Sequence, residues 1–474
     1  MDSTLSEELT TKSATELAAL IRSRSVSSVE VVEAHLRRIE RVNSSLNAVV
    51  TLATDVLDHA RAAEAALTKG DNIGPLHGVP LTVKDTIDTE GLRTTAGSLL
   101  RANHLPDRDA TVVARLKAAG AIILGKTNTA EMAAYYESDN PVFGRTNNPH
   151  NPLMTPGGSS GGEAAAIAAC LSPAGIGSDL AGSIRLPAHF CGIAGLKPTT
   201  GRVPVDGHTP AVSGSLSLGV SIGPMARSVA DLALMFSVIA DDAPLEINGE
   251  QGVNLRGLRA AWYVSDGVAS VDEETARAVE RAANVLRDAG VEVDQVKPPG
   301  VSQGLGLWLE LFSRSVSRQL FELYRGREDE AGPQVAAMLA RISEEDANMA
   351  GKVAVAERLA KAVVERERLR EELLRWMKTT PLIIAPVGAT CAWPHGTQRV
   401  SVRGESISVF RAFSYSQTFN VFGLPCVAIP AGRSREGLPI GIQIIGLPAE
   451  ERTVLAAAQI IEQALGGWQL VRQA

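Results

Sequence analysis

The sequence predicts an α/β fold in which helices cover both faces of a β-sheet. Short apolar runs alternate with amphipathic or Ala-rich stretches of helical length along much of the chain, and this alternation is typical of α/β proteins. Alanine and glycine are abundant and only 4% of the residues are aromatic, which favours close packing of helices on strands. No internal repeat and no linker divides the sequence, so residues 1–474 are expected to form one domain.

The first half of the chain contains clear start signals for helices. Ser13 and Ser27 begin S-x-x-E capping-box patterns, and each precedes a predicted helix within the first 50 residues. We expect Asp109 to cap a third helix. Buried strands are predicted at 81–83, 121–126 and 174–177, and helices at 109–120, 163–170 and from 183 to 190.

The sequence pattern changes after about residue 245. Strands are predicted at 258–264, 291–296, 382–387, 426–432 and 441–446, and helices at 272–290 and about 450–465. Residues 303–378 are helical in pattern and rich in charge. A charge run of this kind indicates solvated helix faces, so we assign it no chemistry.

The composition excludes several classes of protein. A formal net charge of −7 argues against a nucleic-acid binder, which needs a basic surface. The N-terminus MDSTLSEELT is no signal peptide, and no uncharged stretch is long enough to span a membrane. The cysteines show neither CxxC pairing nor metal-ligand spacing and are expected to be reduced; they are Cys170, Cys191, Cys391 and Cys426. We therefore expect a cytoplasmic globular protein.

Common catalytic motifs are absent or out of context. The sequence has no HExxH, no GxxxxGK[ST] and no GxGxxG between a strand and a helix, so neither a metal nor a nucleotide cofactor is expected. The stretch GGSSG at 157–161 satisfies GxSxG with Ser159 at its centre. That motif requires a preceding buried strand, but the residues before it, NPHNPLMTP, are turn formers.

Lys84 is a candidate general base. It ends a predicted apolar strand, where burial lowers the pKa of a lysine by up to about 3–5 units. A neutral lysine can accept a proton without help from histidine. Taken alone, however, Lys84 is more simply interpreted as the partner of Asp85 or Asp88 in a salt bridge.

Ser183 is a candidate nucleophile, although serine at a helix start is also a common N-cap. Unpaired N–H groups at such a position favour developing negative charge. Gly182 and Ala181 are small enough for a carbonyl group to approach these amides. Ser159 could relay a proton between Ser183 and Lys84.

A long compound motif resembles the core of the amidase signature family. It reads GGSSGGEAAAIAACLSPAGIGSDLAGSIRLPAHFCGIAGLKPTTGRVP. The resemblance extends to HGVPLTVKDTIDTEG, PVFGRTNNP and GPMARSVADLAL, and to NVFGLPCVAIPAG and GLPIGIQIIG near the C-terminus, and so covers most of 15–245 and 380–465. It implies an α/β/α sandwich with a large, mixed, mostly parallel twisted sheet. It also implies a catalytic core at 60–245 and a variable helical region at 300–380 that covers the substrate pocket.

The resemblance assigns roles to individual residues. Lys84 is similar to the catalytic lysine, Ser159 to the proton-shuttling serine that follows a cis peptide, and Ser183 to the nucleophile. The backbone amides of the oxyanion hole would come from Leu180, Ala181, Gly182 and Ser183. Supporting polar positions are Ser160, Ser178, Asp179 and Arg185. Ala181 stands where many members have glycine, which could narrow the approach to the oxyanion hole.

The implied reaction is hydrolysis of a linear carboxylic amide through an acyl-enzyme, with no metal or organic cofactor. The stretch EMAAYYESDNPVF would line an apolar acyl pocket through Met132, Tyr135, Tyr136 and Phe143, which favours an apolar or aryl amide. The alternatives are a carbamate (urethane) or ester hydrolase and the amidase-like subunit of a tRNA-dependent amidotransferase. Such subunits carry an RRIMLG-like segment where this chain reads GKVAVAERLAKAV. A non-catalytic binding protein is disfavoured by the three catalytic residue types, and a homodimer is compatible with the family.

Overall fold

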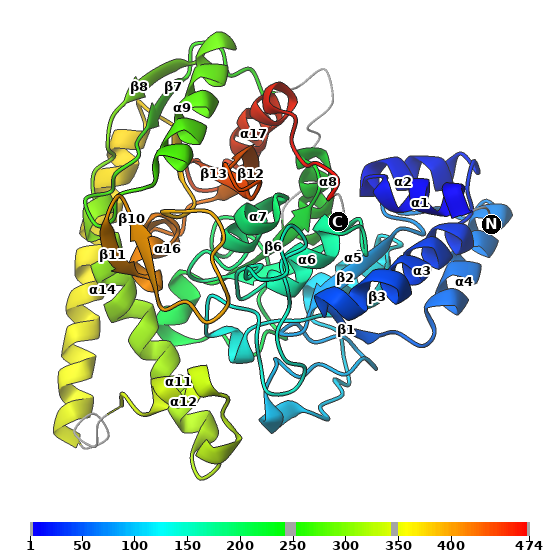
Figure 1. The fold of residues 1–474 in the computed structure, drawn as a ribbon, viewed down its shortest axis with the longest axis horizontal. Coiled ribbons are helices and arrows are strands. Elements are labelled where there is room, and N and C mark those ends of the chain that lie inside the picture. The colour runs from blue at the N-terminus through cyan, green and yellow to red at the C-terminus, as the bar shows by residue number, and fades with distance from the viewer. Residues whose placement is uncertain (1–2, 242–252, 343–348, 472–474) are drawn as a thin grey trace.

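The computed structural model describes residues 3–241, 253–342 and 349–471. The change of sequence pattern near residue 245 lies outside the described residues. Within them, eleven strands form one sheet, which runs from the N-terminal helices at one end of the molecule to α9, β7 and β8 at the other (Figure 1). The strand order is β1 (Val49–Leu52), β3 (Ile122–Thr127), β2 (Pro80–Lys84), β4 (Ala174–Asp179), β6 (Ser221–Ala226), β5 (Ala194–Lys197), β12 (Cys426–Arg433), β13 (Pro439–Ile445), β9 (Leu382–Pro386), β7 (Arg259–Trp262) and β8 (Glu292–Gln295). A separate hairpin pairs β10 (Arg399–Val402) with β11 (Glu405–Ser408).

The α/β class and the mixed sheet are confirmed, but the expectation of a mostly parallel sheet is wrong. Only β3–β2–β4 and β9–β7–β8 are parallel sets, and the other described neighbours in the sheet pair antiparallel. The strand β6 inserts antiparallel between β4 and β5. A short turn joins β12 to β13, and connections of that length permit only antiparallel pairing.

Helices cover both faces of the sheet, as predicted. One core contains residues of α2 (Ala14–Arg22), α5 (Thr111–Ala118), α8 (Val229–Ile239), α9 (Glu273–Asp288) and α17 (Glu451–Leu465). The cores on the other face contain residues of α3 (Ser28–Leu46), α4 (Val56–Lys69), α6 (Gly161–Ala168), α7 (Arg185–Cys191), α10 (Gly304–Trp308), α14 (Met349–Met377) and α16 (Ser414–Val421). In β3, Ile123 belongs to the first core and its neighbours Ile122 and Leu124 to another, because side chains alternate between the faces of a strand.

The capping predictions are confirmed at two of three helices. Ser13 and Ser27 each form a complete capping box at the start of α2 and α3. The prediction for Asp109 is wrong, because the carboxylate of Asp206 accepts from the N–H of Thr111 instead. Asp109 accepts from the N–H of Glu90 and pairs with Lys117.

The predicted helical region 303–378 consists of α10, a π-helical turn (Leu309–Ser313), α11 (Arg314–Tyr324), α12 (Pro333–Leu339) and α14, with residues 343–348 outside the description. A buried contact anchors α11 to the scaffold. The Tyr324 hydroxyl lies 2.6 Å from Glu131 Oε1 and 2.5 Å from Ser98 Oγ. Glu131 also accepts from the N–H of Gly332, just before α12. The other α-helices of the described ranges are α1 (Ser3–Thr11) and α15 (Val409–Ala412).

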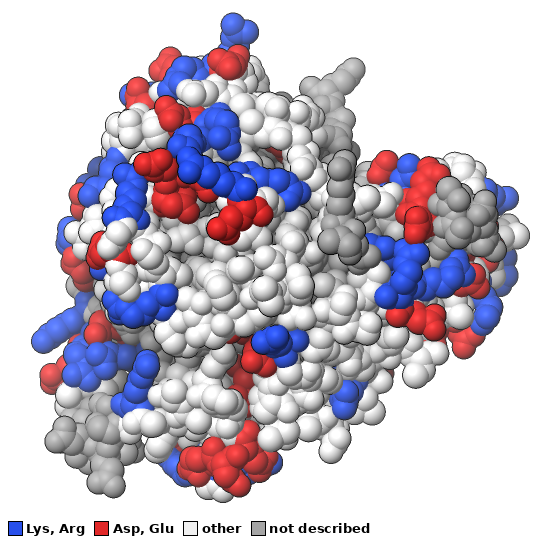
Figure 2. Space-filling view, in the orientation of Figure 1, with Lys and Arg blue, Asp and Glu red and all other residues white. Residues whose placement is uncertain are grey.

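Charged side chains of both signs are interspersed on the surface in view, and they gather toward its edges rather than its centre (Figure 2). None of the helices in the described ranges is both long and apolar enough to cross a lipid bilayer. The described His, Cys, Asp and Glu side chains form no group of three or more that could hold a metal ion.

Candidate active site

Lys84 lies at the end of β2 and is fully buried. Its Nζ is 2.7 Å from Ser159 Oγ and 3.0 Å from Ser178 Oγ. Burial lowers the pKa of Lys84 to about 7, although the nearby carboxylates of Asp179 and Glu163 oppose the shift. A lowered pKa favours the neutral amine near neutral pH, and the neutral amine is the form that a general base requires.

The simpler interpretation of Lys84 as a salt-bridge partner is wrong. The carboxylate of Asp85 accepts from the backbone N–H and the hydroxyl of Thr95. Asp88 pairs with Arg101 at 3.2 Å. Both acids thus have other partners, and Lys84 contacts two serine hydroxyls instead.

Ser159 lies in the Gly-rich loop before α6. No strand leads directly into this loop, because β3 ends at Thr127 and a short helical turn lies between; this agrees with rejection of the GxSxG interpretation. The Gly158–Ser159 peptide is cis, as the family resemblance implies. Only glycine fits at 158, because a Cβ there would lie 2.6 Å from the backbone nitrogen of Glu137. The carbonyl of Ser159 accepts from the Thr129 hydroxyl at 2.8 Å. Close packing and this hydrogen bond hold the backbone at Ser159 in place.

Ser183 lies in the turn between β4 and α7, two residues before the helix rather than at its first position. Gly182 has φ +100°, and a Cβ there would lie 2.8 Å from Ser416 Cβ. The turn therefore depends on glycine. Ser183 and Ser159 line the same cavity. No hydrogen bond joins their two hydroxyls among the described contacts, and such catalytic contacts often tighten only when substrate binds.

The backbone amides around Ser183 divide into two groups. The N–H of Gly182 donates to Asp179 Oδ1 at 2.8 Å, so the expectation that it serves the oxyanion hole is wrong for this structure. The amides of Leu180, Ala181 and Ser183 donate to no protein atom in the part of the chain that the structure describes. These three amides remain open to a bound oxyanion.

Asp179 and Arg185 form a fully buried ion pair that shapes the turn. Arg185 Nε and Nη2 each lie 3.0 Å from a carboxylate oxygen of Asp179. Burial alone would raise the pKa of Asp179, but the Arg185 guanidinium and its hydrogen bonds outweigh it and hold that pKa well below its usual range. Arg185 also contacts Gln443 on β13 and Asn420 on α16. The turn that carries Ser183 is thus held by the C-terminal part of the chain.

The other two predicted supporting serines also lie at the site. Ser160 donates its N–H to the carbonyl of Ser183 at 3.2 Å and its hydroxyl to the carbonyl of Ser178 at 3.3 Å. Ser178 Oγ lies between Lys84 Nζ and His208 Nε2, the latter at 2.9 Å. Burial, reinforced by the charge of Lys84, lowers the pKa of His208 to about 4.

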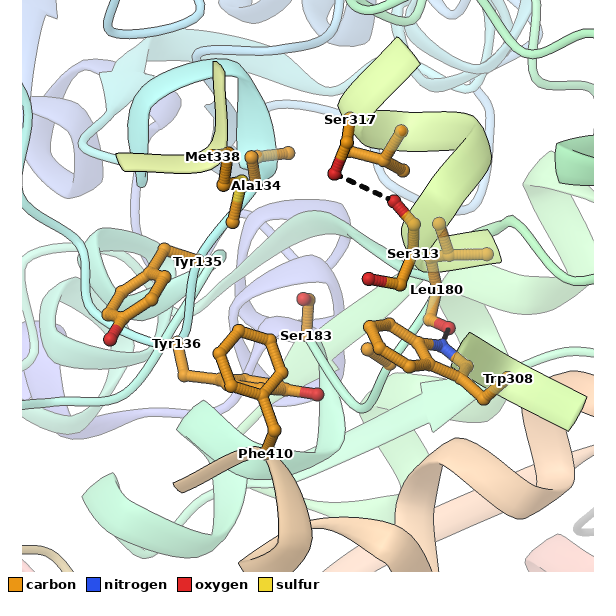
Figure 3. Close-up of a pocket in the computed structure, with 13 residues that line it drawn as sticks. Ala134, Tyr135, Tyr136, Leu180, Ser183, Trp308, Ser313, Ser317, Met338 and Phe410 are labelled. Carbon is orange, nitrogen blue, oxygen red and sulfur yellow. Dashed lines mark hydrogen bonds between the residues drawn. The ribbon is translucent and has the colours of Figure 1, made fainter. Parts of the chain in front are cut away.

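Two small cavities meet at Ser183. The first, of about 60 Å³, has aromatic walls, and Figure 3 shows the Ser183 hydroxyl pointing into it between Phe410 and Trp308. The indole Nε1 of Trp308 donates to the carbonyl of Leu180 at 2.9 Å. The second cavity, of about 50 Å³, is lined by Ser159, Ser178 and His208 together with apolar side chains.

The predicted pocket residues lie in different places. Tyr135 and Tyr136 line the aromatic cavity, and Met132 lines the second. Phe143 lines neither, so its expected place in the acyl pocket is wrong. Its ring instead packs under the guanidinium of Arg93, with 5.1 Å between the Arg93 Cζ and the ring centroid.

Comparisons with known proteins agree with this geometry. The family model described as Amidase matches residues 30–455. Human fatty-acid amide hydrolase 2 is 32% identical over 499 aligned residues, covering 98% of this chain and 91% of that protein. A glutamyl-tRNA(Gln) amidotransferase subunit from Thermus thermophilus is 35% identical over 471, covering 95% and 96%. The crystal structure of a bacterial aryl acylamidase superposes with a TM-score of 0.84 at 26% identity, covering 96% of each chain.

The chain belongs to the amidase family. The resemblance found in the sequence is thereby confirmed, and the protein is a hydrolase acting on C–N bonds in amides.

Sequence reasoning missed three residues at the site of this amidase. Trp308 and Phe410 line the aromatic cavity, and His208 contacts Ser178. Trp308 precedes α11 in the charged helical region to which no chemistry was assigned. The only available signal for His208 was a polar residue in a turn, DGHTP, which is far too weak to identify a site residue.

Proposed function

We propose that this amidase cleaves a linear apolar or aryl amide to a carboxylic acid and an amine or ammonia. Ser183 forms the acyl-enzyme, and Ser159 and Lys84 relay the proton. The observation that carries the proposal is the 2.7 Å contact between buried Lys84 and Ser159 beside a cavity that Ser183 also lines.

The mechanism begins with neutral Lys84. Lys84 Nζ accepts the proton of Ser159 as Ser159 Oγ takes the proton of Ser183, whose oxygen attacks the amide carbonyl. The open amides of Leu180, Ala181 and Ser183 stabilise the oxyanion. The relay returns the proton to the leaving nitrogen, and water then releases the acid by the same path in reverse.

The two cavities at Ser183 support an apolar substrate. One substituent of the scissile amide would lie among Tyr135, Tyr136, Trp308 and Phe410, where aromatic edges and faces suit an aryl or alkyl group. The other would lie against Met132 and neighbouring apolar side chains. The names of two relatives, a fatty-acid amide hydrolase and an aryl acylamidase, agree with this substrate class.

Two alternatives use the same residues. A carbamate or ester presents a similar carbonyl to Ser183. The amidotransferase subunits among the relatives support a role in a glutamine-dependent complex, although residues 351–363 of this chain differ from the segment expected in such subunits.

Hydrolysis of a substrate panel at about pH 8 tests the proposal. The panel contains p-nitroacetanilide, a short and a long aliphatic amide, an aryl carbamate and glutamine. We expect cleavage of the anilide or of an aliphatic amide, and loss of that activity in Ser183→Ala. Activity that persists in Ser183→Ala, or cleavage of glutamine alone, would contradict the proposal. Preference for the carbamate would identify a urethane hydrolase.

We further propose a cytoplasmic location and a small-molecule substrate rather than nucleic acid or membrane. All four cysteines are free, and three of them are buried, as expected in a reducing compartment. A homodimer remains an expectation that size-exclusion chromatography tests.

A further inference from the structure

His208 takes no part in the proposed proton relay, yet it is partly buried against the site and lines the second cavity. It lies in the connection between β5 and β6, next to Pro210. Its Nε2 is 2.9 Å from Ser178 Oγ, and its Nδ1 is 2.9 Å from the carbonyl oxygen of Pro210. Both ring nitrogens of His208 therefore have partners.

The partners of His208 determine the direction of each hydrogen bond. The Pro210 carbonyl can only accept, so Nδ1 carries the proton and donates it. In a neutral imidazole, Nε2 must then be the acceptor, and it receives the hydroxyl proton of Ser178. The oxygen of Ser178 is consequently left to accept an N–H of Lys84 at 3.0 Å.

The direction matters because neutral Lys84 has two N–H bonds and one lone pair. If the Ser178 hydroxyl pointed at Lys84, it would occupy that lone pair. Lys84 would then donate to Ser159 and could not accept its proton. With the Ser178 proton held by His208, the lone pair of Lys84 is free to face Ser159 at 2.7 Å.

We propose that His208 is a positioning residue that holds the Ser178 proton away from Lys84 and so keeps the Lys84 lone pair directed at Ser159. This inference rests on the proposed roles of Lys84 and Ser159. His208 exchanges no proton during turnover, and its low pKa agrees with an imidazole that stays neutral across the working pH range.

Two matched substitutions separate the two contacts of His208. His208→Gln places an acceptor near the position of Nε2 and can still receive the Ser178 proton. His208→Asn keeps a donor near the position of Nδ1 for the Pro210 carbonyl but is too short to reach Ser178. His208→Leu removes both contacts.

The readout is the second-order rate at which an alkyl fluorophosphonate labels the protein, with the modified serine identified by mass spectrometry. We expect His208→Asn and His208→Leu to slow labelling of Ser183 about tenfold or more, a part of the roughly 10²–10⁴-fold contributed by a general base. His208→Gln should retain most of the wild-type rate. In a Ser178→Ala background, His208→Asn should cause no further loss, because the two residues act through one contact.

Equal labelling of the wild type and His208→Asn would overturn the inference, as would an undiminished effect of His208→Asn in the Ser178→Ala background. Thermal unfolding of each variant identifies any that fail to fold, and the Gln and Asn pair still decides the question if His208→Leu does so. Absence of labelling at Ser183 in the wild type would instead contradict the proposed function, which is a distinguishable result.

Discussion

The pH dependence of this amidase should follow the protonation of Lys84. Only the neutral amine can accept the proton of Ser159, so kcat/KM should rise with pH, with a midpoint near the Lys84 pKa of about 7, and level off above it. The sign follows from burial, which disfavours the ammonium form and moves the required neutral form to lower pH.

The expected magnitude follows from the shift of the pKa from 10.5 to about 7. At pH 7 about half of the buried lysines are neutral, against about 3 in 10,000 for an unshifted lysine. At pH 5 the neutral fraction falls to about 1%, so kcat/KM should be roughly a hundredfold below its plateau. His208 does not contribute to this fall in kcat/KM between pH 7 and pH 5, because its pKa is about 4.

The assay is kcat/KM for the best substrate of the panel between pH 5 and 9.5. Glu163→Gln is the matched control, because burial also raises the pKa of Glu163 to about 7 and its charge raises that of Lys84. In this variant kcat/KM should still fall toward acid pH, with the midpoint of the fall at a somewhat lower pH than in the wild type. If kcat/KM of Glu163→Gln no longer falls toward acid pH, or if kcat/KM still rises steeply above pH 9, the assignment of the pH dependence to buried Lys84 is refuted.

Two further substitutions test the surroundings of Ser183. Arg185→Met leaves Asp179 as an unpaired buried charge, so the free energy of unfolding should fall by about 3–5 kcal/mol in urea denaturation; a loss below about 1 kcal/mol would show that the pair contributes little. Trp308→Ala removes one wall of the aromatic cavity and the hydrogen bond to Leu180, so kcat/KM should drop about tenfold or more for an aryl amide but much less for a short aliphatic amide. An equal drop for both substrates would mean that Trp308 does not contribute to selectivity.

The parts of the site that the sequence predicts are those encoded in short stretches. Ser159 and Ser183 lie in glycine-rich turns whose backbone requirements are visible locally, and Lys84 ends an apolar run. The strand β6 was not predicted because Gly223 and Pro224 interrupt its run of apolar side chains. The structure nevertheless requires glycine at 223, because a Cβ there would lie 2.1 Å from the carbonyl oxygen of Leu196.

Other features could not be predicted because they depend on contacts between distant segments. The helix α16, SYSQTFNV, is fully buried although five of its eight residues are serine, threonine, glutamine or asparagine. Its Gln417 bonds to Tyr136, and its Asn420 bonds to Asp179. Such partners are more than 200 residues away in sequence, and no local periodicity reveals them. The same holds for Trp308 and Phe410 in the aromatic cavity.

The buried contacts of Arg185 with Asn420 and Gln443 also bear on biosynthesis. A nascent chain that has emerged as far as residue 400 already contains the lysine and both serines of the proposed relay, but the two residues that brace the turn carrying Ser183 are still in or before the ribosome tunnel. The hydrolase is therefore expected to be inert until the segment that carries Asn420 and Gln443 has left the ribosome, so that synthesis of this late segment itself switches on the enzyme.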